Sequence, residues 1–167
     1  MSTTFVAVLM GSDSDLPTMQ ATLDILKHLG IRYEVRITSA HRTPEATHAY
    51  VTDADARGCA AFIAAAGLAA HLAGAVSANT VKPVIGVPLD AGPLQGMDAL
   101  LSTVQMPAGI PVACVAIGKA GARNAAWLAA QIMAVSDPQL ANRLRQERAA
   151  NAQTVIDKNT DLQAKLS

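Results

Sequence analysis

The chain has 167 residues and no net formal charge, because 13 lysines and arginines balance 13 aspartates and glutamates. This length is typical of one domain with a buried core. The sequence contains no run of basic residues, so nucleic acid is not an expected partner. It also contains no apolar stretch long enough to suggest a membrane span or a leader segment. We therefore expect a soluble, cytoplasmic protein.

Five short apolar runs have the length and residue content of buried strands: Val6–Leu9, Tyr33–Ile37, Ala61–Ala65, Val84–Val87 and Val112–Ile117. A helix is expected after the first run, with Pro17 in its first turn and Gly30 as its end. A second is expected after the next run, with Thr43 as N-cap, Pro44 at the first position and Gly58 as its end. This alternation predicts an α/β fold, a three-layer doubly wound parallel sheet with helices on both faces.

The segment from Pro138 onward is polar and favours helix, with sparse apolar positions at Leu140, Leu144, Val155, Ile156 and Leu162. We expect one or two exposed helices there that pack on another subunit. The chain is predicted to be a single domain over residues 1–167, with a core at about 5–137 and a helical tail at 138–167.

Composition also bears on assembly and on metal binding. Hydrophobic residues make up 51% of the chain although only 3% is aromatic, and this apolar surplus predicts burial between subunits of a homo-oligomer. Cys59 and Cys114 lie far apart, in or beside apolar runs, without the spacing of a zinc site or a redox pair. We expect two buried thiols and no metal.

The unusual stretches of the sequence all follow predicted strands, and parallel α/β sheets bind ligands at the carboxyl ends of their strands. They are GSDSD after the first strand, SAHRTP after the second, AAAGLAAHLAG after the third, GVPLDAGPLQG after the fourth and AIGKAG after the fifth. We expect these five loops to converge on one edge of the sheet.

The loops carry groups suited to an anionic ligand. Three serines supply hydroxyl donors: Ser12, Ser14 and Ser39. Arg42 offers a planar fork for phosphate oxygens, and the following helix N-termini favour a phosphate. Asp13 and Asp15 would repel a phosphate, so at least one is expected on neutral hydroxyls such as those of a ribose. The alternative for this serine and aspartate cluster is a capped helix start in a solvated loop.

His41 is the candidate proton carrier. Imidazole titrates near neutral pH, and this residue stands between Ser39 and Arg42 in a strand-end loop. His71 lies in a loop of small residues, where it either orients the ligand or backbone or simply packs; the sequence leaves both open.

Four stretches, in this order, resemble the PurE family, the N5-carboxyaminoimidazole ribonucleotide mutases of bacterial purine synthesis: MGSDSD, SAHRTP, AAHLAG and LLSTVQMPAGIPVACVAIGKAGARNAAWLAAQI. The likeness runs from about Val6 to about Asp137. It implies a flavodoxin-like fold assembled as an octamer, with active sites at subunit junctions. It also implies an isomerisation that moves the carbamate carboxyl to C4 of the imidazole ring. The sequence lacks metal-ligand, nicotinamide and Walker lysine motifs, which fits a reaction that needs no cofactor.

The same resemblance implies roles for individual residues. The positions that hold the ribose 5-phosphate are matched by Ser12, Asp15, Ser39 and Arg42. His41 matches the general acid/base, and Gly67 and His71 match the loop lining the carboxyl-transfer pocket. The family loop reads closer to AGAGGAAHLPG, from which this chain departs at Ala65, Leu68 and Ala73. Ala65 and Leu68 restrict the backbone wherever a glycine would adopt positive φ.

In the expected mechanism, carbon dioxide leaves the carbamate and is recaptured by the ring carbon inside a dry wall of Ala, Gly and Leu. His41 protonates the amine side and later removes the ring-carbon proton. The carboxylase branch of the family, which uses free carbon dioxide and aminoimidazole ribonucleotide, is the alternative; the retained AAHL favours the mutase branch. A non-catalytic nucleotide-binding or receiver module is disfavoured, since Ala64–Ala66 offers no aspartate to phosphorylate. A flavin carrier is disfavoured because the candidate loops lack aromatic stacking partners.

Overall fold

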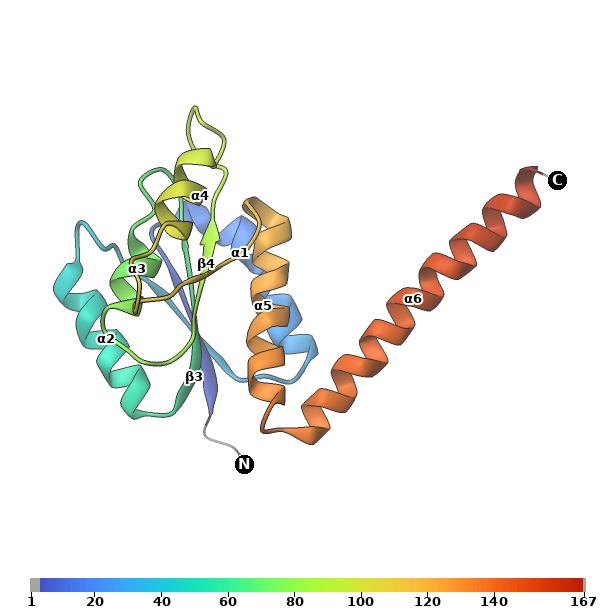
Figure 1. The fold of residues 1–167 in the computed structure, drawn as a ribbon, viewed down its shortest axis with the longest axis horizontal. Coiled ribbons are helices and arrows are strands. Elements are labelled where there is room, and N and C mark those ends of the chain that lie inside the picture. The colour runs from blue at the N-terminus through green and yellow to red at the C-terminus, as the bar shows by residue number, and fades with distance from the viewer. Residues whose placement is uncertain (1–3, 167) are drawn as a thin grey trace.

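The computed structural model describes residues 4–166, which form a three-layer α/β structure (Figure 1). Its five strands are parallel and lie in the order β2-β1-β3-β4-β5. This is the strand order of flavodoxin-like folds, so the predicted fold class is confirmed. The strands are β1 (Phe5–Met10), β2 (Tyr33–Ile37), β3 (Cys59–Ala66), β4 (Val84–Pro88) and β5 (Ala113–Cys114).

Six α-helices connect and follow these strands within the described part of the chain. They are α1 (Leu16–His28), α2 (Pro44–Ala56), α3 (Leu72–Ser77), α4 (Met97–Val104), α5 (Gly118–Ala134) and α6 (Pro138–Leu166). A single 3-10 turn, η1 (Asp13–Asp15), precedes α1. Gly30 and Gly58 follow α1 and α2 with φ of 67° and 92°, so both predicted helix ends are confirmed. None of the described helices combines the length and hydropathy that crossing a bilayer requires.

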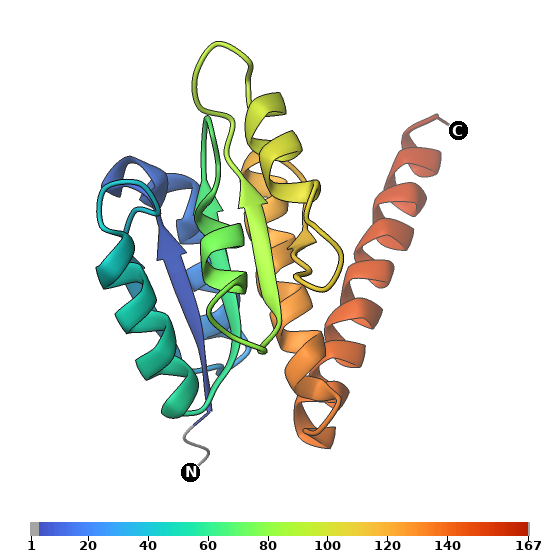
Figure 2. The ribbon, with the colours of Figure 1, turned by 60° about the vertical axis from the view of Figure 1, so that its left-hand side comes forward.

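The core lies on both faces of the sheet, because successive strand side chains point to opposite sides. Val6, Val8 and Met10 of β1 pack with α1 and α5. Phe5, Ala7 and Leu9 of the same strand pack with α2 and α3. The two views in Figures 1 and 2 show these helix pairs on opposite sides of the sheet. Every residue of β1 is buried, as expected for the central run of a parallel sheet.

The fifth strand is shorter than predicted. The run Val112–Ile117 was expected to be a strand, but β5 covers only Ala113 and Cys114, which pair with Ile85 and Gly86. β5 lies at the edge of the sheet, so it has one neighbour, and the chain turns into α5 immediately afterwards with Gly118 at a φ of 69°. The apolar residues of this run therefore pack beside the sheet without extending it.

The predicted polar tail is a single helix. α6 has 29 residues and diverges from the rest of the chain in both ribbon views (Figures 1 and 2). Leu140 is buried against the core and Leu144 packs beside it. Beyond them the helix is exposed, including Val155 and Ile156. Glu147 also pairs with His28 of α1 at 2.7 Å. The first turns of α6 therefore belong to the α/β core, and most of the helix beyond Glu147 is exposed.

Both cysteines are free thiols. Cys59 is buried as predicted, and burial raises the pKa of its thiol to about 11. Cys114 in β5 is only half-buried, although burial also raises its pKa.

Candidate active site

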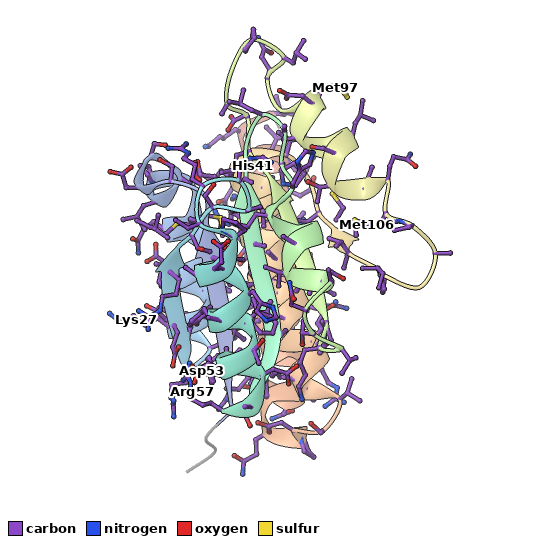
Figure 3. The ribbon with its side chains drawn as sticks, turned by 90° about the vertical axis from the view of Figure 1, so that its left-hand side faces the viewer. Lys27, His41, Asp53, Arg57, Met97 and Met106 are labelled. Carbon is purple, nitrogen blue, oxygen red and sulfur yellow. The ribbon has the colours of Figure 1, made fainter. Side chains whose placement is uncertain are left out.

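A cavity of about 400 Å³ opens at the carboxyl ends of β1, β2 and β3. It is lined by all seven residues that the sequence assigned to the site: Ser12, Asp15, Ser39, His41, Arg42, Gly67 and His71. Figure 3 shows His41 at this end of the sheet, with Asp53 and Arg57 toward the opposite end. The placement follows from topology, since parallel strands deliver their following loops to one edge.

Not all five of the loops at this edge of the sheet line the cavity. Among the described residues, the loop after β4 contributes only Ala91 to the lining, and the loop after β5 contributes none. β5 is separated from β1 by two strands, so its loop lies beyond the cavity. All five strands are parallel, so the five loops do leave at one edge as predicted, but the cavity at that edge is formed mainly by the first three.

The loop after β1 is held by its own side chains. Asp15 Oδ2 accepts a hydrogen bond from the Ser12 backbone N–H at 3.0 Å, and Ser12 Oγ accepts one from the Ser14 N–H at 3.3 Å. Asp15 lines the cavity, whereas Asp13 accepts bonds within the loop from Ser12 and Ser14. The two carboxylates therefore differ: Asp15 alone of the two faces the ligand space.

Burial is the main reason that the pKa of Asp15 is raised, and the backbone N–H of Ser12 opposes this effect. A raised pKa brings the carboxyl closer to its neutral form at mildly acidic pH. An uncharged carboxyl can donate a hydrogen bond to a hydroxyl or a phosphate oxygen. The same loop is also a capped helix start, so the structural interpretation and the ligand interpretation hold together.

The loop after β2 is folded around the Ser39 hydroxyl. Ser39 Oγ accepts from the backbone N–H of His41 at 3.3 Å and of Arg42 at 3.1 Å. Both bonds use the oxygen as acceptor, so its proton is left to be donated into the cavity. Thr43 is the N-cap residue of α2 as predicted, but its side chain makes no capping hydrogen bond; its hydroxyl instead bonds to the backbone N–H and C=O of Ser39.

Arg42 is the cation of the cavity. None of the ion pairs among the described residues involves its guanidinium. α1 and α2 begin at the loops that carry Asp15 and Arg42, so their N-termini add positive potential at the same place. Guanidinium, serine hydroxyls and two helix N-termini are the groups that commonly bind phosphate in proteins.

His41 and His71 are in direct contact. Nε2 of His41 lies 2.8 Å from Nδ1 of His71, and the rings meet edge to face with centroids 4.9 Å apart. One of these two nitrogens carries the shared hydrogen, so the tautomer of each ring is coupled to that of the other. The sequence left the role of His71 open; the structure makes it the hydrogen-bond partner of the candidate proton carrier.

The loop after β3 forms the small-residue wall of the cavity. Gly67 is packed so closely that a Cβ there would lie 2.7 Å from Cβ of Ala91. Leu68 adopts φ of 56°, a conformation that favours glycine and that costs a non-glycine residue about 1 kcal/mol or more. The expected restriction at Ala65 is wrong, because Ala65 lies in β3, where extended backbone suits any residue.

A family model described as AIR carboxylase matches residues 5–154. The chain belongs to the AIR carboxylase family. The sequence-based resemblance to PurE proteins is thereby confirmed over most of the chain.

Two of the proteins similar to this chain carry the same name. The chain is 53% identical over 152 residues to the N5-carboxyaminoimidazole ribonucleotide mutase of Pseudomonas aeruginosa, covering 91% of this chain and 93% of that protein. It is 50% identical over 157 residues to the protein of that name in Bacillus subtilis, covering 94% and 97%. The crystal structure of Treponema denticola PurE superposes with a TM-score of 0.86 at 32% identity, covering 95% of this chain and 98% of that one.

The cavity of this AIR carboxylase family chain also has lining residues that sequence reasoning missed, including Ala40, Leu72 and Ala91. They lie within the stretches SAHRTP, AAAGLAAHLAG and GVPLDAGPLQG, but were not singled out because their side chains carry no reactive or polar group. No group of three or more potential metal ligands occurs among residues 4–166.

Proposed function

We propose that this chain converts N5-carboxyaminoimidazole ribonucleotide to 4-carboxy-5-aminoimidazole ribonucleotide. The relatives at 53% and 50% identity carry the name of this reaction. The observation in the structure that best supports it is the His41–His71 hydrogen bond at a cavity that also holds a phosphate-binding group of side chains. The reaction needs both: an anchor for the ribonucleotide and a titratable group that gives and takes one proton.

The phosphate of the substrate binds between the loops after β1 and β2. Arg42 supplies a bidentate fork, and Ser39 donates the hydroxyl proton that its loop bonds leave free. Ser12 and Asp15 close the other side, with Asp15 directed to ribose hydroxyls or to the phosphate in its neutral form. The imidazole then extends toward His41 and the loop after β3.

The histidine pair can supply the proton that the reaction consumes and accept the proton that it releases. As the carbamate C–N bond breaks, its electron pair stays on the exocyclic nitrogen, which takes a proton from His41, and carbon dioxide is released. C4 of the ring then forms a bond to that carbon dioxide, and its hydrogen leaves as a proton that returns to His41. One proton is given and one recovered, so no external acid or base is consumed.

His71 makes His41 a better proton carrier. When His41 Nε2 carries the shared hydrogen, its Nδ1 is a base; when the hydrogen sits on His71 Nδ1, the Nδ1 of His41 is an acid. In a pair that holds one proton more than two neutral imidazoles, Nδ1 of His41 gives its proton to the exocyclic nitrogen while the shared hydrogen moves across the 2.8 Å bond from Nδ1 of His71 to Nε2 of His41, so Nδ1 of His41 becomes a base. The shared hydrogen moves back when the ring-carbon proton returns to Nδ1 of His41.

The loop after β3 keeps carbon dioxide near the ring. Gly67, Leu68 and Ala69 line the cavity and have no ionisable side chain, so this wall offers few hydrogen-bonding groups to water. Recapture then competes well with escape. The strained backbone of Leu68 fits this view, because strain persists at sites where the surrounding structure dictates one shape.

Purified protein given N5-carboxyaminoimidazole ribonucleotide, without ATP or added metal, is expected to form the 4-carboxy product, followed by its absorbance. Absence of turnover by folded protein would overturn the proposal. The family description, AIR carboxylase, favours a second candidate, carboxylation of aminoimidazole ribonucleotide by free carbon dioxide. Assaying that substrate with bicarbonate in parallel distinguishes the two.

We also propose that the chain works in the cytoplasm as a closed homo-oligomer, an octamer by its family resemblance. Met97, Leu101 and Val104 on α4 are 52%, 53% and 45% exposed, and the outer half of α6 carries further exposed apolar side chains. Such faces are typical of surfaces buried between subunits. Sedimentation at micromolar concentration should show no stable monomer; a predominant species of monomer mass would refute the assembly.

A further inference from the structure

The hydroxyl groups of Ser102 and Thr103 on α4 make hydrogen bonds to the backbone N–H and C=O of Ala70, in the loop after β3. Ser102 Oγ accepts a hydrogen bond from the N–H of Ala70 at 3.0 Å. Thr103 Oγ1 donates to the C=O of Ala70 at 3.4 Å and to that of Ala99 at 2.7 Å. Ala70 is 2% exposed, so solvent has little access to replace these partners. The loop is thereby attached to a helix that is remote in the sequence.

The attachment point lies directly beside the catalytic pair. Ala70 is the residue before His71, and the backbone N–H of His71 is turned back onto the C=O of Ala69 at 2.9 Å. Leu68, two residues earlier, has the left-handed φ described above. A strained, largely small-residue loop gains little rigidity from its own side chains. Its shape depends on outside contacts, and the hydrogen bond to Ser102 is one of them.

α4 is itself fixed against the sheet, so it can serve as an anchor. Gly86 of β4 leaves room for Thr103: a Cβ at Gly86 would lie 2.4 Å from the Thr103 methyl. Ser102 Oγ lies 2.7 Å from the C=O of Asp98, so its proton is donated within the helix while its oxygen accepts from Ala70. The hydroxyl both donates and accepts a hydrogen bond, and this restricts its orientation.

We propose that Ser102 is a positioning residue for the carboxyl transfer, acting through Ala70 to hold His71 against His41 and to keep the carbon dioxide wall closed. The proposal rests on the proposed function for its chemistry. Ser102 does not line the cavity, so it is not a catalytic residue. Loss of its hydroxyl leaves the Ala70 N–H without its partner and frees the loop next to His71.

The test uses two variants of the same shape. Ser102→Thr retains the hydroxyl, and Ser102→Val replaces it with a methyl. We expect Ser102→Thr to resemble the wild type, and Ser102→Val to lose roughly 10-fold to 100-fold in kcat with little change in KM, the scale of a small misplacement of reacting groups. Ser102→Val should also release more aminoimidazole ribonucleotide and carbon dioxide per product formed, because the wall no longer retains the gas.

Ser77→Ala is the control, since Ser77 is a buried helical serine that donates to the C=O of Pro111, at the end of α3 farther from the loop after β3. A Ser102→Val enzyme with the kcat and leakage of Ser77→Ala would overturn the proposal. Amide hydrogen exchange at Ala70 gives a readout independent of activity: it should accelerate in Ser102→Val and not in Ser102→Thr. Unchanged exchange would overturn the anchor even if the wild type proved inactive, whereas inactivity of the wild type alone would overturn the proposed function.

Discussion

His41 and His71, which are 30 residues apart in the sequence, share a hydrogen bond of 2.8 Å between Nε2 and Nδ1. They come from loops that follow β2 and β3, the two strands on either side of β1. The bond therefore exists only because the sheet places β1 between them with both loops at one edge. In the mechanism that we propose, this pair of rings, and not a single imidazole, exchanges protons with the substrate.

Replacement of His41 by asparagine should separate chemistry from binding. His41→Asn removes the proton carrier while retaining a polar side chain, so we expect turnover to fall by about 10²- to 10⁴-fold. Nucleotide affinity, measured by calorimetry with the product, should stay near the wild-type value. Retained turnover would show that another group carries the proton.

Replacement of His71 should have a smaller effect with a different character. In His71→Asn the proton of His41 is no longer shared with a second titrating ring, so the pH dependence of kcat should change in shape and its value should fall by roughly 10-fold to 100-fold. His48→Asn is the control, because His48 is an exposed histidine bonded to Asn79 outside the cavity. A pH profile like that of the wild type would mean that His71 only packs.

Arg42→Lys tests the phosphate site. Lysine keeps the charge but loses the two-pronged geometry, so substrate binding should weaken by about 1–3 kcal/mol, the scale of a hydrogen bond to a charged group. The loss should disappear for the dephosphorylated ribonucleoside. Arg145→Lys, on the exposed part of α6, provides the control. If Arg42→Lys binds nucleotide and nucleoside with the wild-type preference, the phosphate lies elsewhere.

The ion pair of Glu34 in β2 should make the stability of the fold depend on pH in the acid range. The guanidinium of Arg57 donates to both carboxylate oxygens at 2.6 and 2.9 Å and lowers the pKa of Glu34 from 4.5 to about 2, with further help from the Tyr50 hydroxyl. A lowered pKa in the folded state means that this contribution is present above 4.5 and is lost as the pH falls toward 2.

The free energy of unfolding, measured by urea titration across that pH window, should therefore fall less steeply for Glu34→Gln than for the wild type. Asp161→Asn, an exposed carboxylate on α6, should follow the wild-type slope. Equal slopes for Glu34→Gln and the wild type would show that the ion pair does not contribute in solution.

The boundaries of the first four strands agree with the prediction within two residues, and β1, β3 and β4 were predictable because each is an apolar run bounded by turn residues. β2 is a strand as predicted but is not buried, since it contains Glu34 and Arg36 and lies at the edge of the sheet. The length of β5 was not predictable, since an edge strand extends only as far as it pairs with its one neighbour, and here that pairing covers only Ile85 and Gly86. Likewise, the seven site residues stand in motifs at strand ends, where topology alone brings them together.

The contacts within the site could not be predicted in the same way. The His41–His71 bond depends on side-chain orientations in two separate loops, and nothing in the spacing of the residues specifies it. The hydrogen bond between Ala70 and Ser102 depends on the position of α4, which packs closely against the sheet because Gly86 has no side chain. The stretch LLSTVQMP was recognisable as a family motif, but its sequence contains no sign of the hydrogen bond that Ser102 makes.

The most direct test of the proposed carboxyl transfer follows a carbon label. Wild-type protein is given unlabelled N5-carboxyaminoimidazole ribonucleotide in carbon-labelled bicarbonate, without ATP, and the 4-carboxy product is analysed by mass spectrometry at early times. In the proposed transfer the wall that includes Gly67 and Leu68 holds carbon dioxide for recapture, so the product should carry little label. Product labelled to the level of the surrounding bicarbonate would mean that carbon dioxide comes from solution, and it would contradict transfer within the site.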